Sequence, residues 1–199
     1  MVKRPLPWMV LSVQSTLTTD ILLSLWFILP AYVANASPVL LGGGTPIDLG
    51  KKFFDGRRIF GDGKTIRGFI SGIFCGFLVG LLQVFVNPTL EKLIEQHVTL
   101  LPYQRSLLRT NFIIAILLPM GAMVGDLIGS FIKRRLGLER GAPAPLLDQL
   151  DFLIGALLFT SFVFTVPFIC VTILLVVTLI IHLLTNALGY ILGLKNVPW

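Results

Sequence analysis

The chain has 199 residues, of which 55% are hydrophobic and 13% are charged, and its formal net charge is +6. This composition excludes an ordinary water-soluble domain and is typical of an integral membrane protein. Cys75 and Cys170 lie in separate apolar stretches without C-x-x-C spacing, so neither a disulfide framework nor a zinc site is predicted. The positive net charge favours contact with an anionic leaflet and an anionic ligand. Nucleic-acid binding is not predicted, because the sequence has no basic patch with interleaved aromatic residues.

A transmembrane helix needs about 20 largely apolar residues to cross about 30 Å of hydrocarbon. Five such segments are predicted, and Pro167 between the last two indicates a tight helical hairpin. The fourth segment is short, so we expect its helix to begin before Phe152. We therefore predict an all-α integral membrane protein with one membrane-embedded catalytic domain over residues 1–199. In chain order the spans are residues 18–36, 68–86, 111–132, 152–166 and 168–194.

Lysine and arginine are concentrated in two long loops, about residues 37–67 and 133–151. Together with Lys195 these loops place eleven cations on one side and leave five on the other, so the loops should be cytoplasmic. This orientation puts the N-terminus outside and the C-terminus in the cytoplasm. An N-terminal signal peptide cleaved after residues 34–36 is a weaker alternative, because it would export the most basic loop.

Glycine recurs every fourth residue in the second span and again in the third. Such flat faces allow close approach between helices in a bilayer, so we expect these two helices to contact each other through their glycine faces. Between the two spans, residues 87–102 carry apolar side chains at helical spacing and predict a separate short interfacial helix. The glycines are Gly68, Gly72, Gly76 and Gly80 in the second span and Gly121, Gly125 and Gly129 in the third.

Three carboxylates lie at the cytoplasmic ends of predicted spans. Asp126 sits inside the third span, where an ionisable group costs a few kcal/mol unless it is paired, metal-bound or solvated, so it is a functional candidate with a structural salt bridge as the alternative. Asp148 and Asp151 are three residues apart and share a helix face at the start of the fourth span. Hard oxygen ligands without histidine or thiol suit Mg²⁺, so these three residues predict a site for one or two ions that also bind substrate phosphates.

The first cytoplasmic loop supplies cations and glycines. In "GDGKTIRG", Lys64, Thr65 and Arg67 precede or begin the second span, where backbone N–H groups and the helix dipole favour anions; a solvated loop end is the alternative. The glycine run ending in Thr45 allows close backbone approach to a phosphate or base, but it lacks P-loop spacing and is a weak signal alone.

The segment "SFIKRRLGLERGAPAPLLDQLD" is similar to the signature of phosphatidate cytidylyltransferases, the CDP-diacylglycerol synthases. Its middle departs from that signature, because Glu139, Arg140 and an Ala-Pro repeat replace the usual Lys-Asp and His-Gly-Gly. Over residues 20–195 the chain resembles more closely the compact archaeal branch, the CDP-archaeol synthases. The matching signature positions are Ser130, Ile132, Lys133, Arg134, Asp148 and Asp151.

This resemblance implies a multi-pass cell-membrane enzyme of phospholipid biosynthesis that uses CTP to convert unsaturated archaetidic acid, an isoprenoid glycerol phosphate, to CDP-archaeol and pyrophosphate. Asp126, Asp148 and Asp151 would hold Mg²⁺, and Lys133 or Arg134 would steer the lipid headgroup. Oligomeric state is not indicated. The expected nucleotide contacts are Lys64, Thr65, Arg67 and Gly68 for the phosphates and Asn35, Gly43, Gly44 and Thr45 for cytosine or ribose.

Two other functions are weighed against this one. A CDP-alcohol phosphotransferase motif matches at its opening but has Ile66 for an alanine and Gly80 and Val84 where two metal-binding aspartates belong, so this class is disfavoured. A small cation transporter or channel would also use intramembrane carboxylates, but here the charges cluster on one side and the outer halves of the spans have little polar lining.

Overall fold

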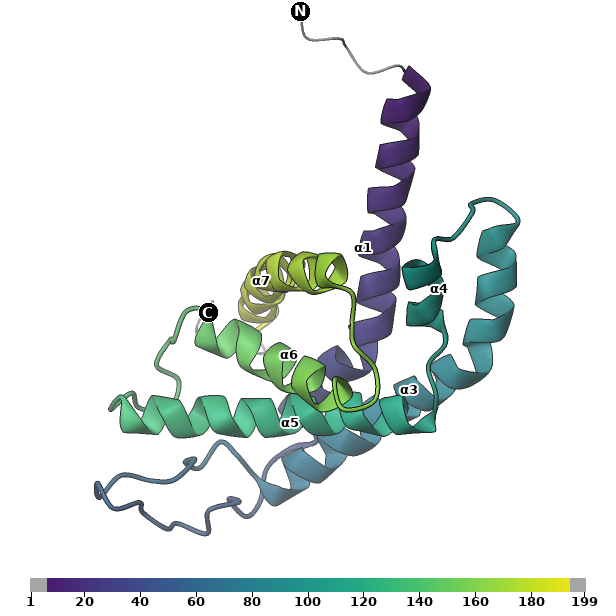
Figure 1. Ribbon diagram of the computed structural model, residues 1–199. Helices are drawn as coiled ribbons and strands as arrows, with labels where there is room; N and C mark the ends of the chain where they lie inside the picture. Colours follow the sequence, from purple (N-terminus) through teal and green to yellow (C-terminus); the bar gives the residue numbers. More distant parts are fainter. Residues whose placement is uncertain (1–6, 194–199) are drawn as a thin grey trace, which may run out of the picture.

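A computed structural model describes the backbone of residues 7–193, with side chains described from residue 16 onward. Within these residues the protein is helical and has two isolated β-bridges but no strand, which confirms the all-α prediction. The helices are α1 (Pro7–Ala36), α2 (Pro38–Leu41), α3 (Ile66–Glu95), α4 (Pro102–Leu108), α5 (Phe112–Arg135), α6 (Leu147–Thr160) and α7 (Phe168–Ile191) (Figure 1).

Four helical segments of the described chain are long and apolar enough to cross a membrane: Thr16–Leu41, α3, α5 and α7. The fourth predicted span corresponds to α6, which begins at Leu147, before Phe152 as expected, but has 14 residues. At about 1.5 Å per residue it extends about 21 Å, less than the hydrocarbon thickness of about 30 Å. The described chain thus has four helices long and apolar enough to span a membrane, with the shorter α6 in the place of the fourth predicted segment, which was also expected to be short.

Helix packing differs from the expected contact between glycine faces. A Cβ on Gly76 of α3 would lie 2.5 Å from the Cβ of Pro119 in α5 and 2.6 Å from the carbonyl oxygen of Pro30 in α1. A Cβ on Gly125 of α5 would instead lie 2.2 Å from the carbonyl oxygen of Asp151 in α6. The glycines of α3 therefore pack against α1 and against non-glycine residues of α5, whereas the glycines of α5 pack against α6. Glycine spacing predicts a flat helix face, but it does not determine which helix packs on that face.

The expected interfacial helix is not separate. It forms the last part of α3, which continues through Pro88 to Glu95 and bends near its C-terminal end (Figure 1). Proline lacks the N–H that would continue the helical ladder, which accounts for a bend there. Helix α4 follows, and its Tyr103 hydroxyl and Gln104 Nε2 donate to the buried carboxylate of Asp20 in α1 at 3.0 and 2.7 Å. This carboxylate thus joins α1 to α4.

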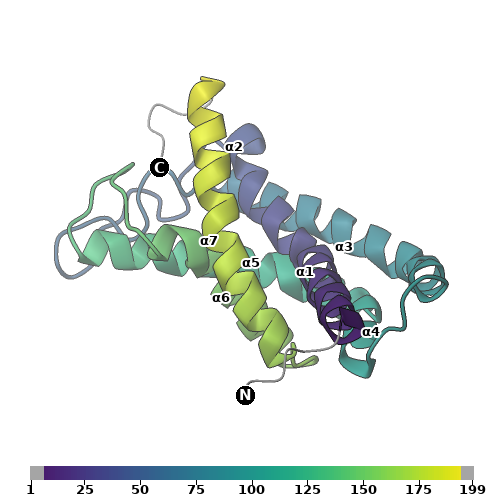
Figure 2. The ribbon, with the colours of Figure 1, turned by 90° about the horizontal axis from the view of Figure 1, so that it is seen from above.

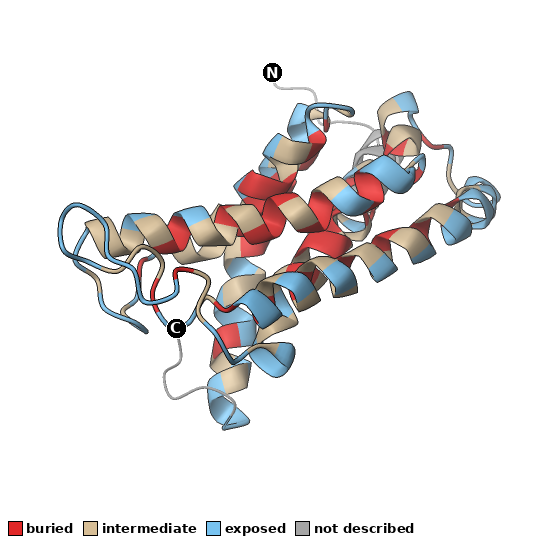
Figure 3. Ribbon diagram, turned by 90° about the horizontal axis from the view of Figure 1, so that it is seen from below, coloured by how far each residue is buried: buried red, intermediate tan, exposed pale blue. Residues whose placement is uncertain are grey.

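The two basic loops project from the same end of the molecule (Figure 1). We call them the α2–α3 loop (residues 42–65) and the α5–α6 loop (residues 136–146). Seen from above, α7 lies across α6 and beside α1 (Figure 2). Buried residues concentrate where the helices cross, whereas the loops and outer helix faces are exposed (Figure 3). The shared end agrees with the loops lying on one side of the membrane, and the assignment of that side to the cytoplasm remains a prediction.

Candidate active site

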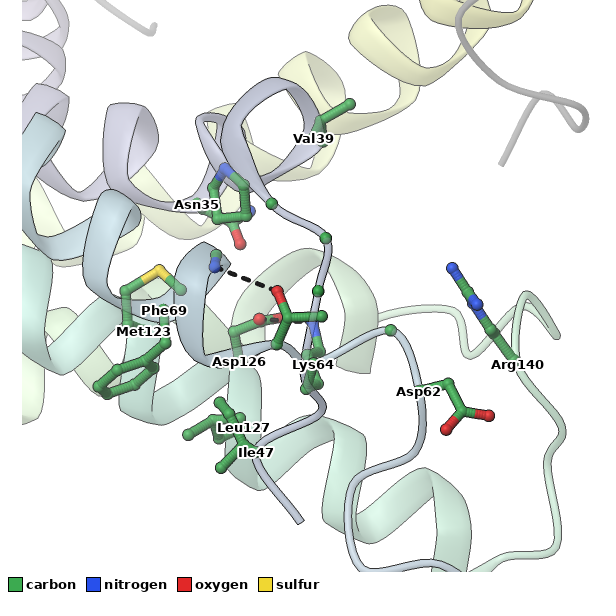
Figure 4. A pocket seen from close by; sticks show the side chains of 17 residues that line it. Asn35, Val39, Ile47, Asp62, Lys64, Phe69, Met123, Asp126, Leu127 and Arg140 are labelled. Carbon is green, nitrogen blue, oxygen red and sulfur yellow. Dashed lines mark hydrogen bonds and ion pairs between the residues drawn. The ribbon is translucent and has the colours of Figure 1, made fainter. Parts of the chain in front are cut away.

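A cavity of about 630 Å³ opens where the α2–α3 loop meets the ends of α1, α2 and α3 and the middle of α5 (Figure 4). We call it the first cavity. Its size lies in the range of about 300–1,000 Å³ that is usual for small-molecule sites. Seven residues expected from the sequence to form a site line it: Asn35, Gly43, Gly44, Lys64, Thr65, Gly68 and Asp126.

Lys64 and Asp126 form an ion pair inside this cavity (Figure 4). The Lys64 Nζ lies 2.5 Å from the Asp126 Oδ2, and the two side chains are 27% and 19% exposed. Lys64 is held by the closure of its loop, because its carbonyl oxygen accepts from the Ile47 N–H at 2.8 Å and its own N–H donates to the Gly61 carbonyl at 3.2 Å. The loop thereby presents one cation to one intramembrane carboxylate.

The start of α3 differs from the expected open anion site. The Thr65 hydroxyl caps the helix by accepting from the Gly68 N–H at 3.1 Å. The Ile66 N–H donates to the Thr45 carbonyl and the Phe69 N–H to the Thr65 carbonyl. Three of the first four helical N–H groups are therefore already bonded within the protein. Attraction for an anion at this end rests on the Lys64 charge and the helix dipole.

The glycine run beside the cavity has a conformational role. A Cβ on Gly42 would lie 2.3 Å from the Pro38 carbonyl oxygen, so the chain passes close against α2 there. Gly43 and Gly44 have φ of +97° and +82°, in the left-handed region that disfavours L side chains. These two residues let exposed backbone line the cavity where any other residue would be strained.

Asp148 forms a second ion pair, outside the first cavity. Its Oδ1 lies 2.5 Å from the Lys133 Nζ at the end of α5, and its Oδ2 accepts from the Ala144 N–H at 2.9 Å. Leu146, just before α6, has a φ of +67°, which is unusual for a residue with a side chain. Asp148 therefore ties the returning chain to both the end of α5 and the start of α6.

Asp151 belongs to α6, and its side chain lies against α5. Its Oδ1 accepts from the Phe152 N–H at 2.6 Å, and a Cβ on Gly129 would lie 2.0 Å from its Oδ2, so the carboxylate occupies the space left by that glycine. A Cβ on Gly125, the neighbour of Asp126, would lie 2.2 Å from the Asp151 carbonyl oxygen, and Asp148 lies three residues earlier on the same helix, so the three aspartates belong to one region.

The region does not contain an assembled metal cluster. Among the residues that the structure describes, no three His, Cys, Asp or Glu side chains are gathered closely enough to hold a metal ion. Asp126 and Asp148 face lysines instead. The structure therefore brings the three predicted metal ligands into one region but not into one cluster.

Three further predicted residues lie away from the lining of the first cavity. The Thr45 carbonyl is used by α3, Arg67 is exposed on the first turn of that helix, and Lys133 faces Asp148. Sequence reasoning missed two charged residues that do line it, Asp62 and Arg140. It also missed an apolar wall formed by Phe69, Met123 and Leu127. Arg140 reaches the cavity from the α5–α6 loop, a tertiary contact that no local motif signals.

Asp48 organises the α2–α3 loop. Its side chain is fully buried, and its Oδ2 accepts from the Phe60 and Gly61 N–H groups at 3.0 and 2.9 Å. Its Oδ1 lies 2.6 Å from the Nη2 of Arg58, which also pairs with Asp62 at 2.6 Å. Burial alone would raise the pKa of Asp48, but the Arg58 guanidinium and the backbone donors outweigh it and hold the pKa well below its usual range. This carboxylate therefore holds the segment that leads to Lys64.

The fold and the cavity together define a class: a multi-pass helical membrane protein with a charged small-molecule site beside its basic loops. Residues 17–199 match the family model described as CarS-like CDP-archaeol synthase. The chain is 52% identical over 177 residues to the CDP-archaeol synthase of Methanocaldococcus jannaschii, covering 88% of this chain and 96% of that protein. It is 55% identical over 174 residues to that of Pyrococcus abyssi, covering 87% and 95%.

A solved structure of an intramembrane enzyme for archaeal membrane lipid biosynthesis aligns with a TM-score of 0.67 and 40% identity, covering 83% of this chain and 94% of that one. The chain belongs to the CDP-archaeol synthase family. The resemblance read from the sequence is thereby confirmed, as are the predictions of a transferase of membrane lipid biosynthesis and of a multi-pass membrane protein.

Proposed function

We propose that this chain transfers the cytidylyl group of CTP to unsaturated archaetidic acid at the first cavity, acting as one catalytic domain. The observation that carries the proposal is the convergence of seven predicted site residues, including the Lys64–Asp126 pair, on one cavity in a member of this family. The cavity lies where the membrane-spanning helices meet the basic loops, so an amphiphilic lipid and a water-soluble nucleotide can both reach it.

The reaction joins two anions. An oxygen of the lipid phosphate forms a bond to the α-phosphorus of CTP, and the bond from that phosphorus to the bridging oxygen of the β-phosphate breaks, which releases pyrophosphate. The lipid phosphate is already ionised near neutral pH, so no general base is required. The main obstacle is charge repulsion, and the task of the protein is to neutralise and orient the phosphates.

Lys64 is the residue we assign to the phosphates inside the cavity. Its ammonium group is neutralised by Asp126. When the nucleotide binds, Lys64 exchanges this partner for phosphate oxygens, and Arg140 at the rim adds a second cation. Asn35, with the backbone of Gly43 and Gly44, is assigned to cytosine or ribose, because these residues supply polar groups on the same cavity wall.

Asp126, Asp148 and Asp151 are the residues we propose to hold Mg²⁺. Carboxylate oxygens are the donors this ion prefers, and the three lie in one region. The ammonium groups of Lys64 and Lys133 lie 2.5 Å from Asp126 and Asp148, respectively. These two carboxylates therefore already stabilise a positive charge. When bound, Mg²⁺ supplies charge neutralisation of phosphate oxygens. Lys133, released from Asp148, is assigned to the phosphate of the lipid.

The test uses purified protein in detergent with CTP, MgCl₂ and unsaturated archaetidic acid, and it measures CDP-lipid and pyrophosphate in equal amounts. Lys64→Gln should lower turnover at least about 100-fold, because one charge-assisted contact to a phosphate in a partly buried site contributes about 3 kcal/mol. Lys51→Gln, on an exposed position of the same loop, is the matched control and should retain full activity. Absence of pyrophosphate release by the wild-type protein would refute the proposal.

A further inference from the structure

A second cavity of about 500 Å³ lies between the two basic loops and adjoins the first. Asp62 and Arg140 line both cavities, so the two share a wall. The charges differ. The first cavity has Lys64 and Arg140 against Asp62 and Asp126, so its charges balance. The second has five cations, which are Lys52, Arg57, Arg58, Arg134 and Arg140, against the two carboxylates Asp62 and Glu139.

Two of these cations have partners within the protein. Arg58 pairs with Asp48 and Asp62. Arg57 donates to the carbonyl oxygens of Arg134 and Arg135, at 3.3 and 2.7 Å, and so caps the C-terminal end of α5. Both arginines hold the cavity wall in place.

The other three cations have no carboxylate partner among the described residues. For Lys52, Arg134 and Arg140, the described part of the chain offers no carboxylate within ion-pair distance. The Arg134 Nε is buried and makes no hydrogen bond with any described residue. A buried guanidinium nitrogen without an acceptor is costly, so Arg134, which lines the second cavity, carries a charge that no described carboxylate compensates.

Two of the three lie beside the shared wall. The Arg134 Nε lies 3.6 Å from the position of a Cβ on Gly61, and the Arg140 Nε lies 3.5 Å from that of a Cβ on Gly63. The two guanidinium groups therefore pack on the glycines that flank Asp62. They stand between the cavity in which we place the chemistry and the second cavity, and a guanidinium binds phosphate oxygens in a bidentate manner.

We propose that the second cavity is a binding site for a diphosphate anion and receives pyrophosphate as it leaves the first cavity. This inference rests on the proposed function, because cleavage of CTP between the α- and β-phosphates creates a highly charged product beside a wall lined with cations. The positive excess of the second cavity draws the product across that wall, away from the lipid and out of the charge-balanced first cavity. Release of pyrophosphate and entry of the next nucleotide then use different routes.

The experiment measures the binding of inorganic pyrophosphate by calorimetry to the full-length protein in detergent, with saturating CTP and no lipid. CTP fills the first cavity and the absence of acceptor prevents turnover, so the measured binding reports the second cavity. Wild-type protein should bind pyrophosphate under these conditions. Lys52→Gln and Arg134→Gln should each weaken that binding about tenfold, the loss expected for one charge-assisted contact. Lys51→Gln, next to Lys52 but outside the lining of both cavities, should bind as wild type.

Lys52 is exposed, so its variant separates binding from folding. Lys52→Gln should keep the KM for CTP within about twofold and raise the inhibition constant of pyrophosphate about tenfold. Loss of pyrophosphate binding when CTP is present would overturn the inference, because the second cavity would then hold the β- and γ-phosphates of the nucleotide itself. Unchanged affinity in both variants would also overturn it. Failure of the proposed function is distinguishable, since it is seen as absent CDP-lipid synthesis while pyrophosphate binding persists.

Discussion

Lys64 and Asp126 lie 62 residues apart in the sequence, and their side chains meet at 2.5 Å inside the first cavity. The pair joins the loop before α3 to the middle of α5. Each charge is neutralised by the other, which offsets the cost of placing an aspartate inside a membrane helix. We propose that binding of nucleotide and metal separates the pair, so that each member then serves the reaction.

Replacing Lys64 or Asp126 tests whether the two residues separate and act on the bound nucleotide. Lys64→Gln and Asp126→Asn should each lower kcat/KM at least about 100-fold, and the double variant should lose much less than the product of the two, because the residues act on one set of phosphates. Initial rates of CDP-lipid formation measure this. Losses that simply multiply, together with normal metal dependence in Asp126→Asn, would show that Asp126 has only a structural role.

Gly129→Ala probes the position of Asp151. The added methyl group would lie 2.0 Å from the Asp151 Oδ2, so the carboxylate or helix α6 must move. We expect turnover to fall at least about tenfold and stability to fall by about 1–3 kcal/mol, the usual cost of overpacking. Ile128→Ala, on an exposed side chain of the same helix, is the control. Wild-type activity in Gly129→Ala would show that the position of this carboxylate is not critical.

Asp48→Asn tests the organisation of the α2–α3 loop. The variant removes the charge that binds Arg58 and should destabilise the loop by about 2 kcal/mol, the value of a hydrogen bond to a charged group. Limited proteolysis within residues 50–60 should therefore become faster at neutral pH. Asp55→Asn, an exposed carboxylate of the same loop, should cost less than about 0.5 kcal/mol.

The same residue predicts a pH dependence. The pKa of Asp48 is lower in the folded protein than its ordinary value of 3.8, so its contribution to stability is complete above about pH 4. That contribution is lost as the pH falls from there through the folded-state pKa. The proteolysis rate of the loop in the wild-type protein should rise over this acidic range. The corresponding rise should be smaller in Asp48→Asn, and equal profiles would contradict the assignment.

Removal of divalent metal should abolish turnover without unfolding the protein. The ammonium groups of Lys64 and Lys133 already neutralise Asp126 and Asp148 at 2.5 Å, so these carboxylates stay paired when no metal is bound. Treatment with EDTA should therefore eliminate CDP-lipid formation, leave the Tm within a few degrees, and be reversed by MgCl₂. Undiminished synthesis in EDTA would exclude the proposed metal role of the three aspartates.

Asp20 is an intramembrane carboxylate with a structural role, in contrast to Asp126, for which we propose a catalytic role. It is buried and accepts hydrogen bonds from Tyr103 and Gln104 of α4. Asp20→Ala leaves these donors without an acceptor and should lower stability by about 1–3 kcal/mol. KM for CTP should not change, because Asp20 does not line the first cavity. A selective change in KM with normal thermal unfolding would argue against this purely structural role.

The sequence by itself determined the features that depend on local pattern or on family signature. Apolar runs located the four long helices, the short run before Pro167 indicated a shortened helix, and the motif ending in Asp148 and Asp151 identified the family. These succeeded because hydropathy and helix period are properties of neighbouring residues. Asp126 and Lys64 were also predicted as site residues from the sequence, but their ion pair was not predicted.

Tertiary structure alone decided which partner each of these residues meets. The glycine face of α5 packs against α6 and not against α3. Asp126 and Asp148 each face a lysine and do not form one cluster with Asp151, and Arg140 reaches the cavity from a distant loop. A flat helix face or a buried charge is compatible with several neighbours of similar energy. The choice among them depends on the packing of all the helices together, which no local stretch of sequence contains.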